Sequence, residues 1–293
     1  MPIDSSIVGT QSEPFVHQID ARWIMAYAAS LGDALPCYFD TRREQGIVAH
    51  PLFPVCVEWP VMLAMRRQLS QHLLTADENI RAVHATHDLI VHRAVRPGDT
   101  LTTRATIAGV EQRKPGAFMT VRFDTTDSSG HKVCETWEGV IYRNTEVVGS
   151  NRLPSQAPEV PALKQANASA RAEISIPIAA GAAHTYTECA RIWNPVHTDA
   201  AVAAAAGLPA ILLHGTATLA LAISRIAEIE AGNDPERVVR AAGRFAAMVF
   251  MPSEIKLRIL SRETAGGVNG ILFEVLNAEG QPAIKNGFVG LRS

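Results

Sequence analysis

Cysteines, basic charge and long hydrophobic runs are all scarce in this sequence, and each scarcity excludes a class of protein. The four cysteines in 293 residues are widely spaced and include no CxxC pair, so neither a disulfide framework nor a zinc knuckle is indicated. The formal net charge is −2, which leaves no basic field to attract a nucleic acid. The first residues lack the basic and apolar regions of a signal peptide. A cytoplasmic protein without a nucleic-acid or membrane partner is expected.

The least polar run also argues against a membrane span. Residues 200–223 are rich in alanine, but Gly207, Pro209, His214 and Gly215 interrupt them. Apolar residues nevertheless make up 47% of the chain, enough for one large core or for two domains of ordinary size.

The same order of patterns occurs twice along the chain. Each half begins with a short helical pattern, continues through a Gly- and Pro-containing loop into a longer helix, and ends in four short segments with turn signals between them. In the first half these are helical patterns at 15–40 and 55–74, then strands near 83–95, 100–111, 117–126 and 132–143. In the second half they are helices at 182–191 and 215–231, then strands near 238–250, 254–264, 266–277 and 281–291. A duplication with a period of about half the chain is therefore predicted.

The helix predicted at 215–231 is apolar on nearly every side until Arg225, so it is expected to be buried. A buried helix followed by a curved antiparallel sheet describes the hotdog fold. The prediction is an α+β protein of two tandem hotdog domains, residues 1–147 and 171–293. Residues 148–170 are proline-containing and weakly periodic, and they are interpreted as a linker.

The stretch from Tyr186 to Gly215 holds the strongest candidate site. Asn194-Pro195 is a turn signal, because proline disfavours the helical region for the residue before it. His197 therefore lies on a loop between ordered elements, a position that suits a residue that meets a ligand. His214-Gly215 then opens the long helix.

This stretch resembles the hydratase-2 motif of the MaoC-like, or (R)-specific enoyl-CoA hydratase, family. The matching residues are Tyr186, Asn194, Pro195, His197, Asp199, the alanine-rich turn at 203–207 and the 211–215 segment. A weaker echo runs from Tyr27 to Asp40, so the chain is similar to tandem double-hotdog members of the family.

The resemblance implies a hydratase or dehydratase that interconverts a 2-enoyl-CoA and a 3-hydroxyacyl-CoA, with no metal or redox cofactor. It makes His197 the catalytic histidine, Asn194 its orienting neighbour and Gly215 the donor of the N–H that holds the thioester oxygen. A helix N-terminus suits that task because its N–H groups are unpaired and its dipole end is positive. Pairing of such chains into homodimers is also plausible.

The motif departs from the family at one decisive position. Ile192 stands where the family has its catalytic aspartate, and isoleucine cannot exchange a proton. Three explanations stay open. Glu188, one helical turn earlier, supplies the missing carboxyl group, or Asp33 and Tyr38 form a modified site in the first half. Otherwise the protein is a non-catalytic acyl-CoA-binding or assembly protein. A composite of Asp33 with His197 ranks last, and a thioesterase is a weaker alternative function.

Three further expectations concern the neighbourhood of this site. Arg191 is either a helix-end cation or a clamp for a second carboxylate on the substrate. His214 is expected to support the loop beside the bound substrate. His84 and His87 are expected to point to opposite faces of a strand, which argues against a metal site there.

Overall fold

The computed structural model describes residues 2–70, 82–159, 170–265 and 268–292. The elements of the first half are β1 (Ile3–Asp4), β2 (Phe15–Gln18), α1 (Ala21–Ser30), α2 (Pro36–Phe39), α3 (Pro54–Ser70), β3 (Ala82–Val91), β4 (Thr100–Arg113), β5 (Gly116–Thr126), β6 (Lys132–Arg143) and β7 (Val147–Val148). Those of the second half are β8 (Ala172–Ile178), α5 (Ala182–Ala190), α6 (Ala200–Ala205), α7 (Gly215–Glu230), β9 (Val238–Phe245), β10 (Ser253–Ala265), β11 (Val268–Leu276) and β12 (Pro282–Arg292).

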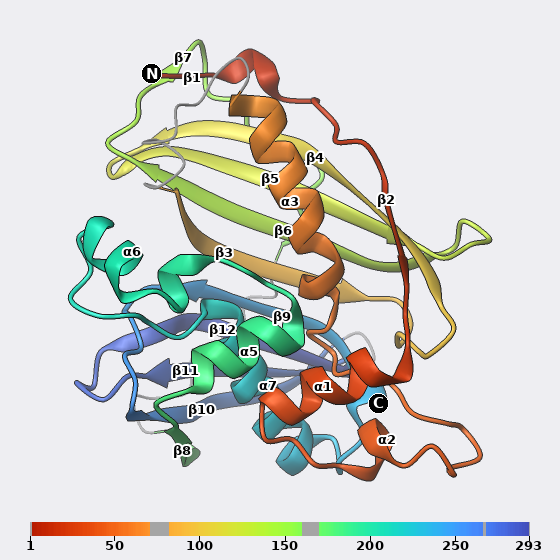
Figure 1. Cartoon of the computed structure of the whole chain (residues 1–293). Coiled ribbons are helices and arrows are strands. Elements are labelled where there is room, and N and C mark those ends of the chain that lie inside the picture. Colours follow the sequence, from red (N-terminus) through yellow and green to blue (C-terminus); the bar gives the residue numbers. More distant parts are fainter. Residues whose placement is uncertain (1, 71–81, 160–169, 266–267, 293) are drawn as a thin grey trace.

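One antiparallel sheet of ten strands runs through both halves (Figure 1). Its strand order is β2-β4-β5-β6-β3-β9-β12-β11-β10-β8, which reads the same from either edge if β3 is matched with β9 and β2 with β8. The predicted duplication is therefore confirmed within the described residues. The predicted linker falls partly on residues 160–169, which lie outside the described part.

A long helix lies against the sheet in each half, as predicted. In Figure 1, α3 crosses the face formed by β4, β5 and β6. In the second half, α7 is buried along most of its length, with Leu219, Ala220 and Ile223 inaccessible to solvent. A helix that is apolar on every side needs cover on every side, and here the sheet and the packed helices provide it. No described helix is long and apolar enough to span a membrane.

One predicted helix began too early, and one edge strand was missed. Residues 15–18 were expected to be helical, but they form the edge strand β2, paired with β4. The helix begins only at Ala21, after Asp20, whose side chain accepts the N–H of Trp23 at 2.7 Å. The matching edge strand of the second half, β8, was missed although its alternation of polar and apolar residues is a strand signal.

The two halves are joined by main-chain pairing and by buried polar contacts. Strands β3 and β9 pair antiparallel across the boundary. The hydroxyls of Tyr27 in α1 and Tyr186 in α5 lie 3.3 Å apart, both rings fully buried. Arg240 donates to both carboxylate oxygens of Asp88 at 2.9 and 2.6 Å, and both side chains are about 15% exposed or less.

Asp88→Asn is expected to lower the free energy of unfolding by roughly 3 kcal/mol, because it leaves the mostly buried Arg240 guanidinium without its anionic partner. Urea unfolding followed by circular dichroism measures this change. Asp40→Asn is the control, because Asp40 pairs with Arg42 at the surface and the pair holds no elements together. Equal midpoints for the wild type and Asp88→Asn would show that the ion pair does not stabilise the joint.

Candidate functional site

A cavity of about 610 Å³ lies where the two halves meet. The second half contributes the motif loop, the start of α7 and the segment after β9, whereas the first half contributes one side of α3 and parts of β3 and β6. Residues far apart in the sequence therefore line one space. Among the predicted site residues, His197, Asn194, His214 and Gly215 all lie in its wall.

His197 is held with one ring nitrogen free. Its Nδ1 lies 2.8 Å from the carbonyl oxygen of Leu212, so Nδ1 carries the proton and Nε2 keeps its lone pair. Burial lowers the pKa of His197 to about 4, and the imidazole is neutral at physiological pH. A neutral imidazole with a free Nε2 is equipped to accept a proton from water.

The loop around His197 is fixed mainly through the backbone and His214. The carbonyl of Asn194 accepts the N–H of His197 at 3.1 Å, but the Asn194 side chain makes no capping hydrogen bond. The ring of His214 stacks on that of His197 with 3.7 Å between centroids. His214 is itself buried, and its Nε2 lies 3.3 Å from the hydroxyl of Thr187. Ring stacking and the Leu212 carbonyl therefore set the orientation of the imidazole.

The first turn of α7 presents unpaired N–H groups to the same cavity. Gly215 and Thr216 begin the helix and line the cavity, and the first N–H groups of a helix have no intrahelical partner. A Cβ on Gly215 would lie 3.0 Å from the ring of Phe245, so glycine allows this close packing. The helix start therefore offers donors and a positive dipole end to an oxygen atom of a ligand.

Two residues considered for the site, Glu188 as the acid beside His197 and Arg191 as a substrate clamp, lie outside the cavity. Glu188 is exposed on α5, where its carboxylate accepts the indole N–H of Trp193 at 3.4 Å. Arg191 ends the helix with a φ of 58°, and its guanidinium lies 4.0 Å from the centroid of the Trp23 ring. Neither residue lines the cavity, whereas Ile192 does. The turn after α5 directs the isoleucine inward and its charged neighbour outward.

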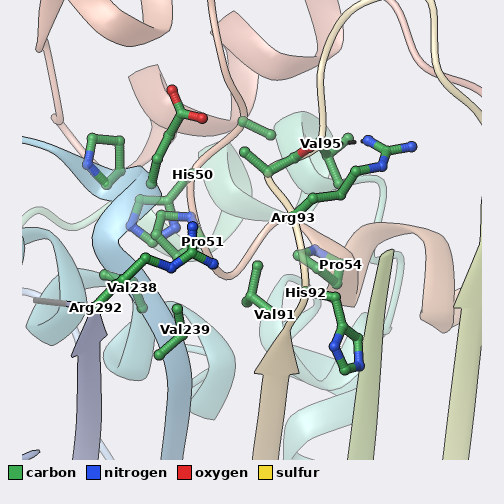
Figure 2. Close-up of a pocket in the computed structure, with 14 residues that line it drawn as sticks. His50, Pro51, Pro54, Val91, His92, Arg93, Val95, Val238, Val239 and Arg292 are labelled. Atoms are coloured by element: carbon green, nitrogen blue, oxygen red, sulfur yellow. Dashed lines mark hydrogen bonds between the residues drawn. The ribbon is translucent and has the colours of Figure 1, made fainter. Parts of the chain in front are cut away.

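The corresponding position in the first half cannot present the same groups. His50 lies four positions before the start of α3, whereas His214 directly precedes α7, and each ring lies near a buried tyrosine, Tyr27 at 5.7 Å and Tyr186 at 5.0 Å. The residue that follows His50 is Pro51, which has no N–H to donate. The pocket beside it is only about 130 Å³, and Figure 2 shows His50 and Pro51 at its wall.

Asp33 and Tyr38 do not line this small pocket, although the Tyr38 ring lies 6.0 Å from that of His50. Tyr38 is inaccessible to solvent, and burial raises its pKa well above the usual value. Burial also raises the pKa of Asp33, which accepts the N–H of Leu35 at 3.4 Å. Neither residue lines either of the two cavities, and the structure does not bring Asp33 to His197.

The carboxyl groups in the large cavity come from the other half of the chain. Glu58 in α3 and Glu138 in β6 are the two acidic residues among the described lining residues. Glu58 is 3% exposed and accepts the hydroxyl of Thr136 at 2.5 Å. Burial raises its pKa to about 8, which favours the protonated carboxyl group near neutral pH. The sequence could not show that Glu58 and His197 line the same cavity, because His197 lies 139 positions after Glu58.

The expectation that His84 and His87 point to opposite faces was wrong. The register of β3 against β6 shifts between His84 and Thr86, so one extra residue turns both histidines to the same side. Their ring centroids are 5.4 Å apart, and both line the cavity. The ligand atoms of His84, His87 and Glu138 all lie within 4.8 Å of one another.

Comparisons with known proteins assign each half to a family of domains. A family model described as "FAS1-like, dehydratase domain region" matches residues 6–136, and one described as "MaoC like domain" matches residues 162–279. A UPF0336 protein of Saccharopolyspora erythraea is 26% identical over 151 residues, which cover 50% of this chain and 94% of that protein. The peroxisomal enoyl-CoA hydratase 2 of Arabidopsis thaliana is 41% identical over 58 residues, 20% of this chain and 19% of that protein.

Solved structures share the whole fold. A MaoC-like dehydratase from Phytophthora capsici superposes with a TM-score of 0.82 at 18% identity, over 97% of this chain and 96% of that one. A Mycobacterium tuberculosis protein described as having a double hotdog fold superposes with a TM-score of 0.64 at 17% identity, over 98% and 96%. The chain therefore folds as two hotdog domains in tandem.

Proposed function

Because this chain belongs to the MaoC-like family, with a FAS1-like dehydratase region ahead of its MaoC-like domain, we propose that it hydrates a 2-enoyl-CoA to a 3-hydroxyacyl-CoA or catalyses the reverse dehydration. The observation that carries the proposal is the free Nε2 of His197 in a cavity that also receives the first N–H groups of α7. The enoyl-CoA hydratase 2 relative supports the same reaction class.

The helix start binds and polarises the thioester. The carbonyl oxygen of the thioester accepts a hydrogen bond from the N–H of Gly215, and the N–H of Thr216 offers a second donor. Negative charge that develops on this oxygen as water adds is stabilised by these fixed donors and by the helix dipole.

His197 acts as the base. Its Nε2 removes a proton from a water molecule as the oxygen bonds to the β-carbon of the substrate. The hydrogen bond from Nδ1 to Leu212 stabilises the imidazolium that forms, because a carbonyl oxygen lies next to the positive ring.

Glu58 takes the role that Ile192 cannot fill. Its neutral carboxyl group donates a proton to the α-carbon, which completes the addition of one water to the double bond. The proton held by His197 then returns to the Glu58 carboxylate through solvent, and both groups regain their starting forms. The acid and the base thus come from different halves of the chain.

Turnover of crotonyl-CoA tests the reaction class. Loss of absorbance by the conjugated thioester, with 3-hydroxybutyryl-CoA as the product, is the expected result. Release of free thiol instead would identify a thioesterase. Binding of acyl-CoA without conversion of any 2-enoyl-CoA, straight, branched or carboxylate-bearing, would identify a binding protein and contradict the proposal.

A further inference from the structure

The first-half wall of the cavity carries a polar cluster that hydration of the double bond does not use. It consists of Arg66, His84, His87 and Glu138, and it lies beyond Phe245 as seen from Gly215. The Phe245 ring lies within 3.0–3.2 Å of a Cβ position on Gly215 and 4.8 Å from the ring of His84. One aromatic ring therefore separates the cluster from the start of α7.

The cluster contains nitrogen atoms that have no partner within the described part of the chain. His87 is 2% exposed, and neither of its ring nitrogens makes a hydrogen bond. The Nε of Arg66 is also buried without a partner, while its guanidinium lies 5.6 Å from the centroid of the Trp59 ring. Buried donors left unpaired are unfavourable, and a ligand that pairs them recovers that free energy.

A negatively charged oxygen group fits these atoms better than a metal ion. The charge of Arg66 acts on both His84 and Glu138, and it opposes a divalent cation at the same place. The three metal-type ligand atoms spread over as much as 4.8 Å, whereas zinc bonds of about 2.1 Å require a spacing of about 3.4 Å. The Nε2 of His84 already lies 3.0 Å from the carbonyl oxygen of Thr86, so the free donors among these described residues are the Arg66 guanidinium and the one N–H of His87. A guanidinium beside such an N–H matches a carboxylate.

The acidic neighbours of Arg66 are themselves largely buried. Burial raises the pKa of Glu58 to about 8, and it raises the pKa of Glu138 against the opposing effect of His87 and Arg66. The Glu138 carboxyl group faces His84, with 3.9 Å between its Oε2 and the His84 Nε2.

We propose that Arg66 and His87 bind a carboxylate at the distal end of the acyl group, so that the preferred substrates are CoA monothioesters of dicarboxylic acids. This inference rests on the proposed function for the orientation of the ligand, with the thioester at Gly215 and the acyl tail extending past Phe245. A clamp for a second carboxylate was one of two interpretations of Arg191 from the sequence, and the proposal places such a clamp in the opposite half.

Binding of saturated acyl-CoAs tests the subsite without any need for catalysis. Glutaryl-CoA and adipyl-CoA are compared by calorimetry with valeryl-CoA and hexanoyl-CoA, which match them in length but lack the carboxylate. At least one carboxylate-bearing thioester is expected to bind about tenfold more tightly than its match. Equal affinities, or equally tight binding of a 5-hydroxyvaleryl thioester, would overturn the assignment to a carboxylate.

Two substitutions test which side chains cause the preference for a carboxylate-bearing thioester. His87→Phe keeps the ring and removes both nitrogens, and Arg66→Met keeps much of the stem and removes the charge. Each is expected to abolish the tenfold preference while leaving valeryl-CoA binding unchanged, which also shows that the variant is folded. His92→Phe is the matched control, because His92 is exposed and lines only the smaller pocket.

The two proposals fail separately. If the preference for glutaryl-CoA persists in both variants, the subsite is wrong even where enoyl-CoA is hydrated. If glutaryl-CoA binds with the expected preference while neither crotonyl-CoA nor glutaconyl-CoA is converted, the hydratase is wrong and the subsite stands.

Discussion

His197→Asn is expected to lower kcat/KM for a 2-enoyl-CoA at least about a hundredfold, the loss that follows removal of a positioned general base. The asparagine amide retains a donor toward the carbonyl of Leu212, which the Nδ1 of His197 contacts at 2.8 Å. It has no nitrogen lone pair where Nε2 faces the cavity. Loop geometry is therefore preserved while the base is removed, and the rate of loss of the conjugated thioester measures the effect.

A second histidine in the same region provides the control. His184 is exposed on α5 and contacts the carbonyl oxygen of Thr198 at 3.0 Å, but it does not line the cavity. His184→Asn is expected to keep the wild-type rate. Saturated acyl-CoA should bind His197→Asn with unchanged affinity, because the loss concerns proton transfer. Wild-type activity in His197→Asn would contradict the site, whatever reaction the protein catalyses.

The fold was readable from the sequence because local patterns and the duplication agree. Alternating strands with turn signals and one helix that is apolar all round leave few ways to bury the apolar surface. The edge strands β2 and β8 were both missed. Strand β2 is short and mostly exposed, so its pattern is weak, whereas β8 alternates clearly but directly follows the residues interpreted as a linker. Phe15 and Val16, for example, are exposed apolar residues in β2.

Only part of the candidate site could be predicted from the sequence. The turn at Asn194-Pro195 and the helix start at Gly215 are recognisable from neighbouring residues, and both line the cavity. The opposite wall of the cavity could not be predicted in this way. Glu58 lines the cavity because α3 packs there, and no sequence motif links Glu58 with His197. The alternation rule also failed at β3, because a bulge at Ala85 follows from the pairing of two strands and not from the residues alone.

If Glu58 donates the proton, as proposed, this division accounts for Ile192 at the motif position. The family resemblance implies an aspartate there as the carboxyl partner of the histidine. In the tandem chain the two halves share one sheet, and α3 brings Glu58 to the cavity that Ile192 also lines. Pro51, which follows His50 in the first half, has no N–H to donate, and the first half contributes one wall of the large cavity.

Glu58→Gln is expected to lower kcat about a hundredfold, because glutamine keeps the shape and the contact with Thr136 but cannot donate the proton to the α-carbon. Glu188→Gln removes the carboxyl group expected from the sequence to act, and it should leave kcat unchanged because Glu188 is exposed outside the cavity. A larger loss of kcat in Glu188→Gln than in Glu58→Gln would instead identify Glu188 in α5 as the proton donor.

The pH dependence separates proton donation by Glu58 from a merely structural role. His197 must be neutral to accept a proton, and burial lowers its pKa to about 4, so the rate falls as the pH drops through that value. Glu58 must be protonated, and burial raises its pKa to about 8, so the rate falls as the pH rises through that value. The wild type should show a bell-shaped profile of kcat, and Glu58→Gln should keep only the acidic limb. An alkaline limb that persists in Glu58→Gln would assign that limb, and the proton, to another group.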